Sequence, residues 1–280
     1  MLRAVRILPV LALVLACGPN RQSPGGDDTG GDAGSGSNPG SSGSDFGMSL
    51  VYAHTGDTLY RVDAMALTTV EVGPLTGIGT ESLTDLAVDK NENMVGITLD
   101  KLFSIDPTTG ATTLIKDLSQ SANGFTSLSY VPTDLNDPNS DDILVSANDQ
   151  GAVYQIDPAS GSATMIGSYG SDGSGNKIIS SGDLIGVRNL GIYATVDVGK
   201  QTGDYLAQID PTTWKATPIG AGTGFSDIFG LGFWAGTVYG FTDKGQMITI
   251  DIHTGVGTMV GSGAQQWFGA GVTTDAPIIE

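Results

Sequence analysis

The chain has 280 residues, of which 42 are glycine, 39% are hydrophobic and only 15% are charged. This length allows one large β domain or two small ones, and the composition favours short strands joined by tight turns. The formal net charge of −18 excludes nucleic acid as an expected partner, because such a surface repels phosphate backbones. A single cysteine excludes an intramolecular disulfide framework.

Residues 1–16 have the features of a secretory signal. Arg3 and Arg6 precede a short apolar run over residues 7–16, and a basic start followed by such a run is typical of exported proteins. About ten apolar residues cannot span a bilayer, because a transmembrane helix takes about 20. We therefore predict a cleaved signal peptide over residues 1–16.

Cys17 stands directly after this apolar run. The segment Val14-Leu15-Ala16-Cys17 resembles the bacterial lipobox, in which the signal is cut before a cysteine that becomes lipidated. The resemblance implies a diacylglycerol and an N-acyl chain such as palmitate on Cys17, and more than one acyl chain gives stable membrane anchoring. Gly18 at the next position implies sorting to the outer membrane, so we expect a lipid-anchored protein of the bacterial cell envelope. The alternative is an ordinary signal peptide with an incidental cysteine.

Residues 17–47 contain this cysteine and then a stretch of Gly, Ser, Asn and Asp with hardly an apolar side chain. Such a composition is typical of a flexible linker, which has a root-mean-square span of roughly 30 Å for about 30 residues. We predict a tether that holds a folded domain just off the membrane.

Five segments of the remaining chain share one pattern: an alternating strand that ends in Asp, a turn, and a second strand rich in Thr, Val and Ile. They cover residues 59–73, 102–116, 153–167, 206–220 and 247–261, and their aspartates are Asp63, Asp106, Asp157, Asp210 and Asp251. Each Asp is expected to accept a hydrogen bond from the backbone two residues on, as in a hairpin turn. One aspartate per repeat favours this structural role over a catalytic or metal-binding set.

The residue that closes the turn differs among the copies. It is Gly110, Gly161 or Gly255 in three of them, where a left-handed conformation is needed. Trp214 takes this place in the fourth copy, and the first copy has neither Pro nor Gly. We therefore expect the turns of the first and fourth copies to differ in conformation from the other three.

Each repeat contains two further strand candidates. One precedes the turn unit, at 85–89, 127–131, 183–187, 227–233 and 269–273, and the other follows a loop, at 49–54, 93–99, 143–147, 191–196 and 237–242. Four antiparallel strands in a unit of 40–55 residues indicate a propeller blade. The predicted fold is all-β, a five-bladed β-propeller of four-stranded antiparallel blades over residues 48–274, with a tail over 275–280. Because the chain begins with a second strand and ends with a first strand, we expect 269–273 to pair with 49–54 and close the ring.

The Asp-Pro-x-Thr-Gly hairpin at residues 106–110 resembles the repeats of bacterial propellers of the YncE-like, streptogramin-lyase-like and quinoprotein-like groups. The resemblance implies the propeller fold and identifies no particular reaction, because one fold supports many functions. The tryptophan-docking pattern of quinoproteins is absent, since none of the three Trp recurs by repeat. This argues against a pyrroloquinoline quinone cofactor.

The mouth of the central channel, where the first strands begin, is the expected place for a ligand. Aligning these starts places Asp85, Ser127, Asp183, Asp227 and Gly269 at one equivalent position. Three carboxylates and a hydroxyl around the axis are a candidate Ca²⁺ site. In the alternative, each Asp accepts hydrogen bonds from backbone N–H groups at the start of its blade.

Two positions earlier in each blade stand Leu83, Phe125, Ser181, Phe225 and Trp267. The aromatic members, Phe125, Phe225 and Trp267, are candidates for lining a ligand site at the mouth. The alternative is that they pack between blades, where large aromatic side chains bury much of their surface.

The loop over residues 133–142 is a second candidate for Ca²⁺. Its oxygen-bearing side chains are Asp134, Asn136, Asp137, Asn139, Asp141 and Asp142, and oxygen ligands at this density suit Ca²⁺. The loop lacks the glycine and the distant Glu of a helix-loop-helix calcium site, so a solvated insertion is the alternative.

No residue set identifies a reaction. The two histidines, His54 and His253, belong to different predicted elements, and the sequence has no G-x-S-x-G elbow, zinc signature or phosphate-binding loop. We therefore expect the propeller to act as a binding platform for a protein, a glycan or a small molecule. The alternative is a lyase or glycoside hydrolase that uses Asp85, Asp183 or Asp227 at the channel mouth.

Overall fold

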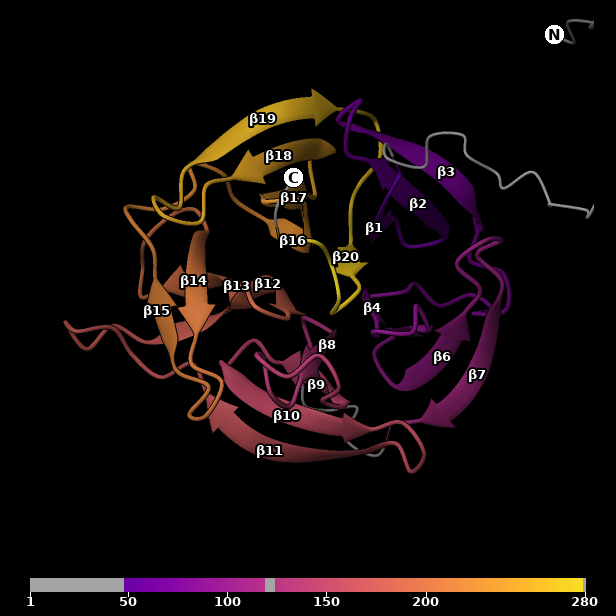
Figure 1. The fold of residues 1–280 in the computed structure, drawn as a ribbon, viewed down its shortest axis with the longest axis horizontal. Coiled ribbons are helices and arrows are strands. Elements are labelled where there is room, and N and C mark those ends of the chain that lie inside the picture. The colour runs from indigo at the N-terminus through magenta and orange to yellow at the C-terminus, as the bar shows by residue number, and fades with distance from the viewer. Residues whose placement is uncertain (1–47, 119–123, 279–280) are drawn as a thin grey trace, which may run out of the picture. The chain divides into compact units, whose positions relative to one another are not determined.

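The computed structural model describes residues 48–118 and 124–278. They form twenty β-strands, arranged as five four-stranded antiparallel sheets around a central axis (Figure 1). This confirms the predicted five-bladed β-propeller. The predicted signal peptide, Cys17 and the whole of the predicted tether belong to residues 1–47 and lie outside the described residues. Within the described ranges, no helix has the length and hydropathy needed to cross a membrane.

Each blade runs from a first strand nearest the axis to a fourth strand at the rim (Figure 1). Blade 1 consists of β20 (Gly269–Val272), β1 (Met48–His54), β2 (Thr58–Asp63) and β3 (Thr68–Pro74). Blade 2 consists of β4 (Asp85–Val88), β5 (Met94–Ile97), β6 (Lys101–Ile105) and β7 (Thr112–Asp117). Blade 3 consists of β8 (Ser129–Pro132), β9 (Asp142–Ala147), β10 (Ala152–Asp157) and β11 (Ser162–Ser168).

The last two blades follow the same order. Blade 4 consists of β12 (Ile178–Val187), β13 (Gly191–Val198), β14 (Tyr205–Ile209) and β15 (Ala216–Pro218). Blade 5 consists of β16 (Ile228–Trp234), β17 (Thr237–Thr242), β18 (Gln246–Ile250) and β19 (Gly257–Ser262). First and second strands are almost wholly buried, whereas β7 is mostly exposed and the other fourth strands are partly exposed.

The two ends of the described chain close the ring. β20 pairs antiparallel with β1, with Val272 opposite Val51 and Ala270 opposite Ala53. This confirms the predicted closure, in which β1 is paired on both sides and β20 is the inner strand of the blade. The residues after β20 also pack on the propeller, since Ala235 N donates a hydrogen bond to Pro277 O at 2.8 Å.

The repeated aspartates form the predicted hairpin turns. In each copy the Asp Oδ1 atom accepts a hydrogen bond from the N–H group two residues on, for example from Thr108 to Asp106 at 2.8 Å and from His253 to Asp251 at 2.8 Å. The Thr108 hydroxyl, followed by its N–H group, lowers the pKa of Asp106. The repeated aspartates therefore cap turns in all five blades.

The prediction that two of these turns differ in conformation is wrong. Leu67 and Trp214 adopt φ values of 53° and 61°, close to the 75° of Gly110 at the same place. A left-handed residue other than Gly costs roughly 1–2 kcal/mol. Trp214 is only 6% exposed and packs on Gly167, and burial of about 150 Å² of indole contributes about 4 kcal/mol. The burial offsets the strain, so the turn is kept without glycine.

These turns also join neighbouring blades. A Cβ on Gly110 would lie 2.8 Å from the carbonyl oxygens of Gly73 and Pro74, at the end of the fourth strand of the preceding blade. Gly161 and Gly255 approach Asp117 and Ile219 in the same way. The repeated turn therefore packs each blade against the one before it, while most core side chains lie between blades.

Candidate functional site

The structural alignment of the first strands differs from the alignment made on sequence. Leu86, Leu184 and Leu231 pair with the equivalent residues Gly96, Ala194 and Gly240 of the second strands. The residues just before them, Asp85, Asp183 and Gly230, are therefore equivalent, together with Ser127 and Gly269.

Asp227 does not occupy this position. It lies three residues before Gly230, which takes the aligned place, and just outside β16. Its side chain is 46% exposed and lies 3.4 Å from Lys244 Nζ. The structure therefore brings Asp85, Ser127 and Asp183 together at the channel and leaves Asp227 outside the group.

Asp85 is fully buried and joins two blades. Its Oδ1 atom accepts a hydrogen bond from Leu86 N at 2.8 Å in its own blade. Its Oδ2 atom accepts one from Leu128 N at 2.6 Å in blade 3. A carboxyl group with both oxygens bonded to backbone N–H groups is positioned to hold strands.

Asp183 is also fully buried and has the same arrangement. Its Oδ1 atom accepts from Leu184 N at 2.6 Å, and its Oδ2 atom accepts from Leu231 N at 2.7 Å in blade 5. Ala270 N of blade 1 also donates to this carboxyl group. The two aspartates together therefore contact the first strands of all five blades.

The Asp85 and Asp183 carboxyl groups are hydrogen-bonded to each other. Burial, and then the charge of Asp183, raise the pKa of Asp85 well above its ordinary value. Burial likewise raises the pKa of Asp183. A hydrogen bond between two carboxyl groups requires a proton on one of them, so the raised pKa values favour a pair that shares one proton.

His54 lies beside this pair and was not singled out by the sequence. Its Nδ1 atom is 2.7 Å from Thr55 O, which assigns the proton to Nδ1 and leaves Nε2 as an acceptor. Nε2 is buried without a hydrogen-bond partner, and burial lowers the pKa of His54 to about 4. A Cβ on Gly269 would overlap both Asp85 Oδ1 and His54 Nε2. The closure of β1 on β20 is what brings this histidine to the channel.

The polar side chains that the structure describes at the channel centre are all buried. Asp85, Asp183, Ser127 and His54 are each 0% exposed, and Ser127 Oγ accepts a hydrogen bond from Ala147 N at 2.9 Å. Among the described residues, no group of three or more His, Cys, Asp or Glu side chains has the geometry to hold a metal ion. The arrangement fixes the blades relative to one another.

The aromatic candidates for the mouth pack between blades. Trp267 is 2% exposed and makes edge-to-face contacts with Tyr60 at 5.1 Å and Phe241 at 5.5 Å. Phe125 contacts Tyr154 edge-on at 5.6 Å. The other residues of this set lie as follows: Leu83 is fully buried, Phe225 is partly buried against the core between blades, and Ser181 is partly buried.

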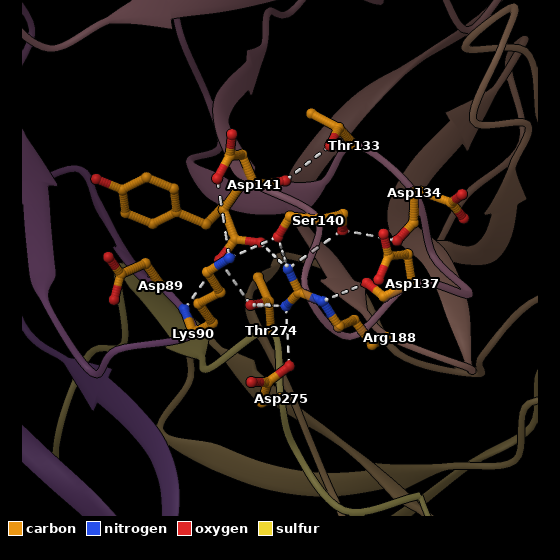
Figure 2. A network of polar contacts seen from close by, with 12 residues as sticks. Asp89, Lys90, Thr133, Asp134, Asp137, Ser140, Asp141, Arg188, Thr274 and Asp275 are labelled. Atoms are coloured by element: carbon orange, nitrogen blue, oxygen red, sulfur yellow. Dashed lines mark hydrogen bonds and ion pairs between the residues drawn. The ribbon is translucent and has the colours of Figure 1, made fainter.

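The loop over residues 133–142 surrounds the guanidinium group of Arg188 (Figure 2). Asp142 Oδ1 accepts from Arg188 Nη2 at 2.6 Å, and Ser140 O accepts from the same nitrogen at 2.7 Å. On the other side of the guanidinium group, Nη1 donates to Thr274 Oγ1 at 2.7 Å and to Asp275 Oδ1 at 2.9 Å. The network thus joins blades 3 and 4 to the segment after β20.

Lys90 of blade 2 completes the network (Figure 2). Its Nζ atom donates to Ser140 O at 2.6 Å, and its backbone N–H donates to Asp142 Oδ2 at 2.9 Å. The side-chain oxygens of Asp142, which the sequence suggested as Ca²⁺ ligands, are therefore hydrogen-bonded to Arg188 and to the backbone of Lys90.

The remaining side chains of this loop serve local turns or face solvent. Asp134 Oδ1 accepts from Asn136 N at 2.9 Å, and Asp137 Oδ1 accepts from Asn139 N at 2.8 Å. Asp141 is 96% exposed. Arg188 was missed on sequence because a single arginine between two strands belongs to no motif.

Comparisons with known proteins find similarity only at the level of structure. No family model and no curated protein matches the chain. Many solved structures match, among them a protein of unknown function from Bacteroides caccae, at 9% identity and a TM-score of 0.37, covering 75% of this chain and 71% of the other. The computationally designed Ika4 protein matches at 19% identity and a TM-score of 0.35, covering 69% and 99%. The C-terminal WD40 domain of Sif2 matches at 15% identity and a TM-score of 0.38, covering 77% and 57%.

Proposed function

We propose that this chain is a lipid-anchored protein of the bacterial cell envelope whose propeller is a binding platform. The observation that carries the platform role is the burial of Asp85 and Asp183, which are 0% exposed and bonded to backbone N–H groups. A general acid or base must come within hydrogen-bond reach of its substrate. The Asp85 and Asp183 carboxyl groups are buried and already accept backbone hydrogen bonds. This favours binding at the outer surfaces over catalysis in the channel.

The anchor rests on the sequence. Cys17 follows an apolar run in a segment that resembles the lipobox, and a Gly/Ser-rich stretch separates it from the propeller. Two or more acyl chains on one cysteine hold a protein on a membrane stably. A tethered rigid propeller is suited to capturing a partner near that membrane.

Metabolic labelling with a palmitate analogue tests the anchor. The wild-type chain is expected to carry the label and to fractionate with outer membranes, whereas Cys17→Ser is expected to carry none. Label on the Cys17→Ser variant would contradict the lipidation proposal.

Affinity capture tests the platform. The full chain, immobilised in a non-ionic detergent, is expected to retain a defined protein or glycan from an envelope extract. A turnover assay on glycans and polysaccharides separates the platform from the lyase or hydrolase alternative. Cleavage that disappears in both Asp85→Asn and Asp183→Asn, with the fold intact, would replace the platform by an enzyme.

A further inference from the structure

A cleft of about 530 Å³ lies between blades 5 and 1, on the face of the propeller where the first strands begin; we call it the blade 5–1 cleft. It adjoins the mouth of the channel, because Phe268 N donates to His54 O at 2.9 Å and Gly269 pairs with His54. A cleft of this size accommodates a small ligand or one unit of a polymer.

The loop that leads into β20 leaves this space open. It covers residues 263–268, whereas the equivalent loops before β4, β12 and β16 are longer and cover 75–84, 169–177 and 219–227. The other side of the cleft is the turn between β1 and β2, which contains Gly56. A Cβ on Gly56 would lie 3.1 Å from both Phe268 Cε2 and Ser82 Oγ. Glycine therefore allows an aromatic ring and a hydroxyl group to lie against this turn.

Two aromatic side chains, Tyr60 and Phe268, give the cleft its apolar surface, and both are partly exposed. Tyr60 is held in place by Trp267, whose ring lies edge-on at 5.1 Å, and by a side-chain hydrogen bond with Gln265. The face of an aromatic ring carries negative potential and attracts C–H groups that neighbouring oxygens polarise. Sugar rings present C–H groups of this kind.

The polar lining can both donate and accept hydrogen bonds. Asp57 Oδ1 accepts from Thr55 Oγ1 at 2.9 Å and from Thr58 Oγ1 at 3.1 Å, which fixes the carboxylate. Within the part of the chain that the structure describes, no residue bonds to Asp57 Oδ2, so this oxygen is left as an acceptor for a ligand. The exposed side chains of Gln266 and Ser82 supply donors and further acceptors.

The charge and the shape of the cleft separate the ligand classes. Asp57 is the one charged side chain of the lining, which includes neither Lys nor Arg, and the net charge of −18 repels an anion. An extended peptide needs separate pockets for its alternating side chains, whereas the apolar side chains here are only Tyr60, Phe268 and Ala264. A neutral ring with many hydroxyl groups matches both the aromatic surface and the mixed donors and acceptors.

We propose that the blade 5–1 cleft binds a neutral sugar unit of a glycan, with the C–H face of the ring against Tyr60 and Phe268 and its hydroxyl groups on Asp57 and Gln266. This assignment deepens the platform function proposed above and rests on it. It places the ligand beside the channel mouth, on the outer surface of the propeller.

Binding is tested by saturation-transfer difference NMR with a panel of neutral oligosaccharides of glucose, galactose, mannose and N-acetylglucosamine. The matching uronic acid and glucosamine oligomers are the charged controls. The protein is the full chain in a polyoxyethylene detergent, which carries no sugar. We expect at least one neutral oligosaccharide to bind with a Kd of about 1 mM or lower, and at least tenfold more tightly than its charged counterpart.

The variants locate the site. Asp57→Ala and Gln266→Ala are each expected to weaken binding of that oligosaccharide at least fivefold. Asp100→Ala is the matched control for the first, because Asp100 holds the position of Asp57 in blade 2, accepts from Thr98 Oγ1 at 3.4 Å and does not line the cleft. Gln150→Ala removes an exposed amide from the turn between β9 and β10, outside the cleft. Both controls are expected to bind like the wild type.

Three results would overturn the inference: no neutral oligosaccharide of the panel binds, the charged counterparts bind equally well, or Asp57→Ala and Asp100→Ala weaken binding equally. The platform is judged separately, by affinity capture from the envelope extract. Capture that is the same for the wild type and Asp57→Ala, together with no oligosaccharide binding, would refute this site and leave the platform in place.

Discussion

Asp85 and Asp183 meet in the channel and share a hydrogen bond, although neither side chain is exposed to solvent. Their backbone partners come from every blade, so the charge state of this pair acts on the whole ring. Burial raises both pKa values above the value near 4 of an unfolded Asp. The folded state therefore binds protons more tightly than the unfolded state does.

The melting temperature is expected to fall as the pH rises from 5 to 9. A raised pKa contributes stability that is complete below about pH 4 and is lost as the pH passes through the raised value. Asp85→Asn removes one of the two titrating carboxyl groups and leaves Asp183, so its melting temperature should change less over this range, whatever its absolute value. Thermal unfolding followed by circular dichroism measures both slopes. Asp141→Asn, at a 96% exposed position, is the control, and a slope in Asp85→Asn equal to that of the wild type would contradict the role of the pair.

Asp204 provides a second titration with a defined midpoint. Burial raises the pKa of Asp204 to about 7, and its Oδ2 atom accepts from Ile228 N at 2.7 Å. Carboxyl ¹³C NMR is expected to show an Asp that titrates near pH 7 and is missing in Asp204→Asn. Its stabilising effect is lost between about pH 4 and 7, by at most about 1.4 kcal/mol per pH unit. A spectrum in which every Asp titrates below pH 5 contradicts this.

Arg188→Ala is expected to destabilise the propeller by about 3–5 kcal/mol, because it leaves Asp142 as a buried charge without its main partner. The two side chains are only 3% and 5% exposed and lie 2.6 Å apart. Urea unfolding of Arg188→Ala, Asp142→Asn and the double variant gives their coupling energy. The double variant should lose less than the sum of the two single variants, and strict additivity would argue against a direct pair.

Trp214→Gly is expected to destabilise the protein by about 1–4 kcal/mol. It removes the strain of a left-handed residue, worth roughly 1–2 kcal/mol, but the loss of a buried indole costs about 3–5 kcal/mol. Leu67→Gly at the equivalent turn is the matched control, because Leu67 is only partly buried, and it should change stability much less. A gain in stability for Trp214→Gly would mean that the strain outweighs the packing.

The repeat made most of the fold predictable. Alternating strands and Asp-capped turns are local patterns, and the count of first and second strands at the two ends required β20 to meet β1. The conformation of the turn at Trp214 was not predictable, because its strain is offset by packing on Gly167 in the preceding blade. The local sequence indicates that Trp214 is strained in a left-handed turn, but it does not show that the indole packs on the preceding blade.

The site was less predictable than the fold. Asp85 and Asp183 were correctly placed at equivalent positions, whereas the equivalent residue in blade 5 is Gly230, three residues after Asp227, and only the strand pairing shows this. His54 reaches the channel only through pairing with Gly269, and Arg188 meets partners 46 and 87 residues away. Contacts of this kind depend on the closed ring and not on a motif.

The pairing of β1 between β20 and β2 has a mechanical consequence. A pull on the chain from the N-terminal side of Met48 runs along β1, at right angles to the hydrogen bonds that join it to both neighbours. These bonds are loaded in shear and share the force, instead of opening one after another from a free edge. Tension on this end is thus resisted by two ladders at once, and the strand that takes the load is also the one that carries His54 into the channel.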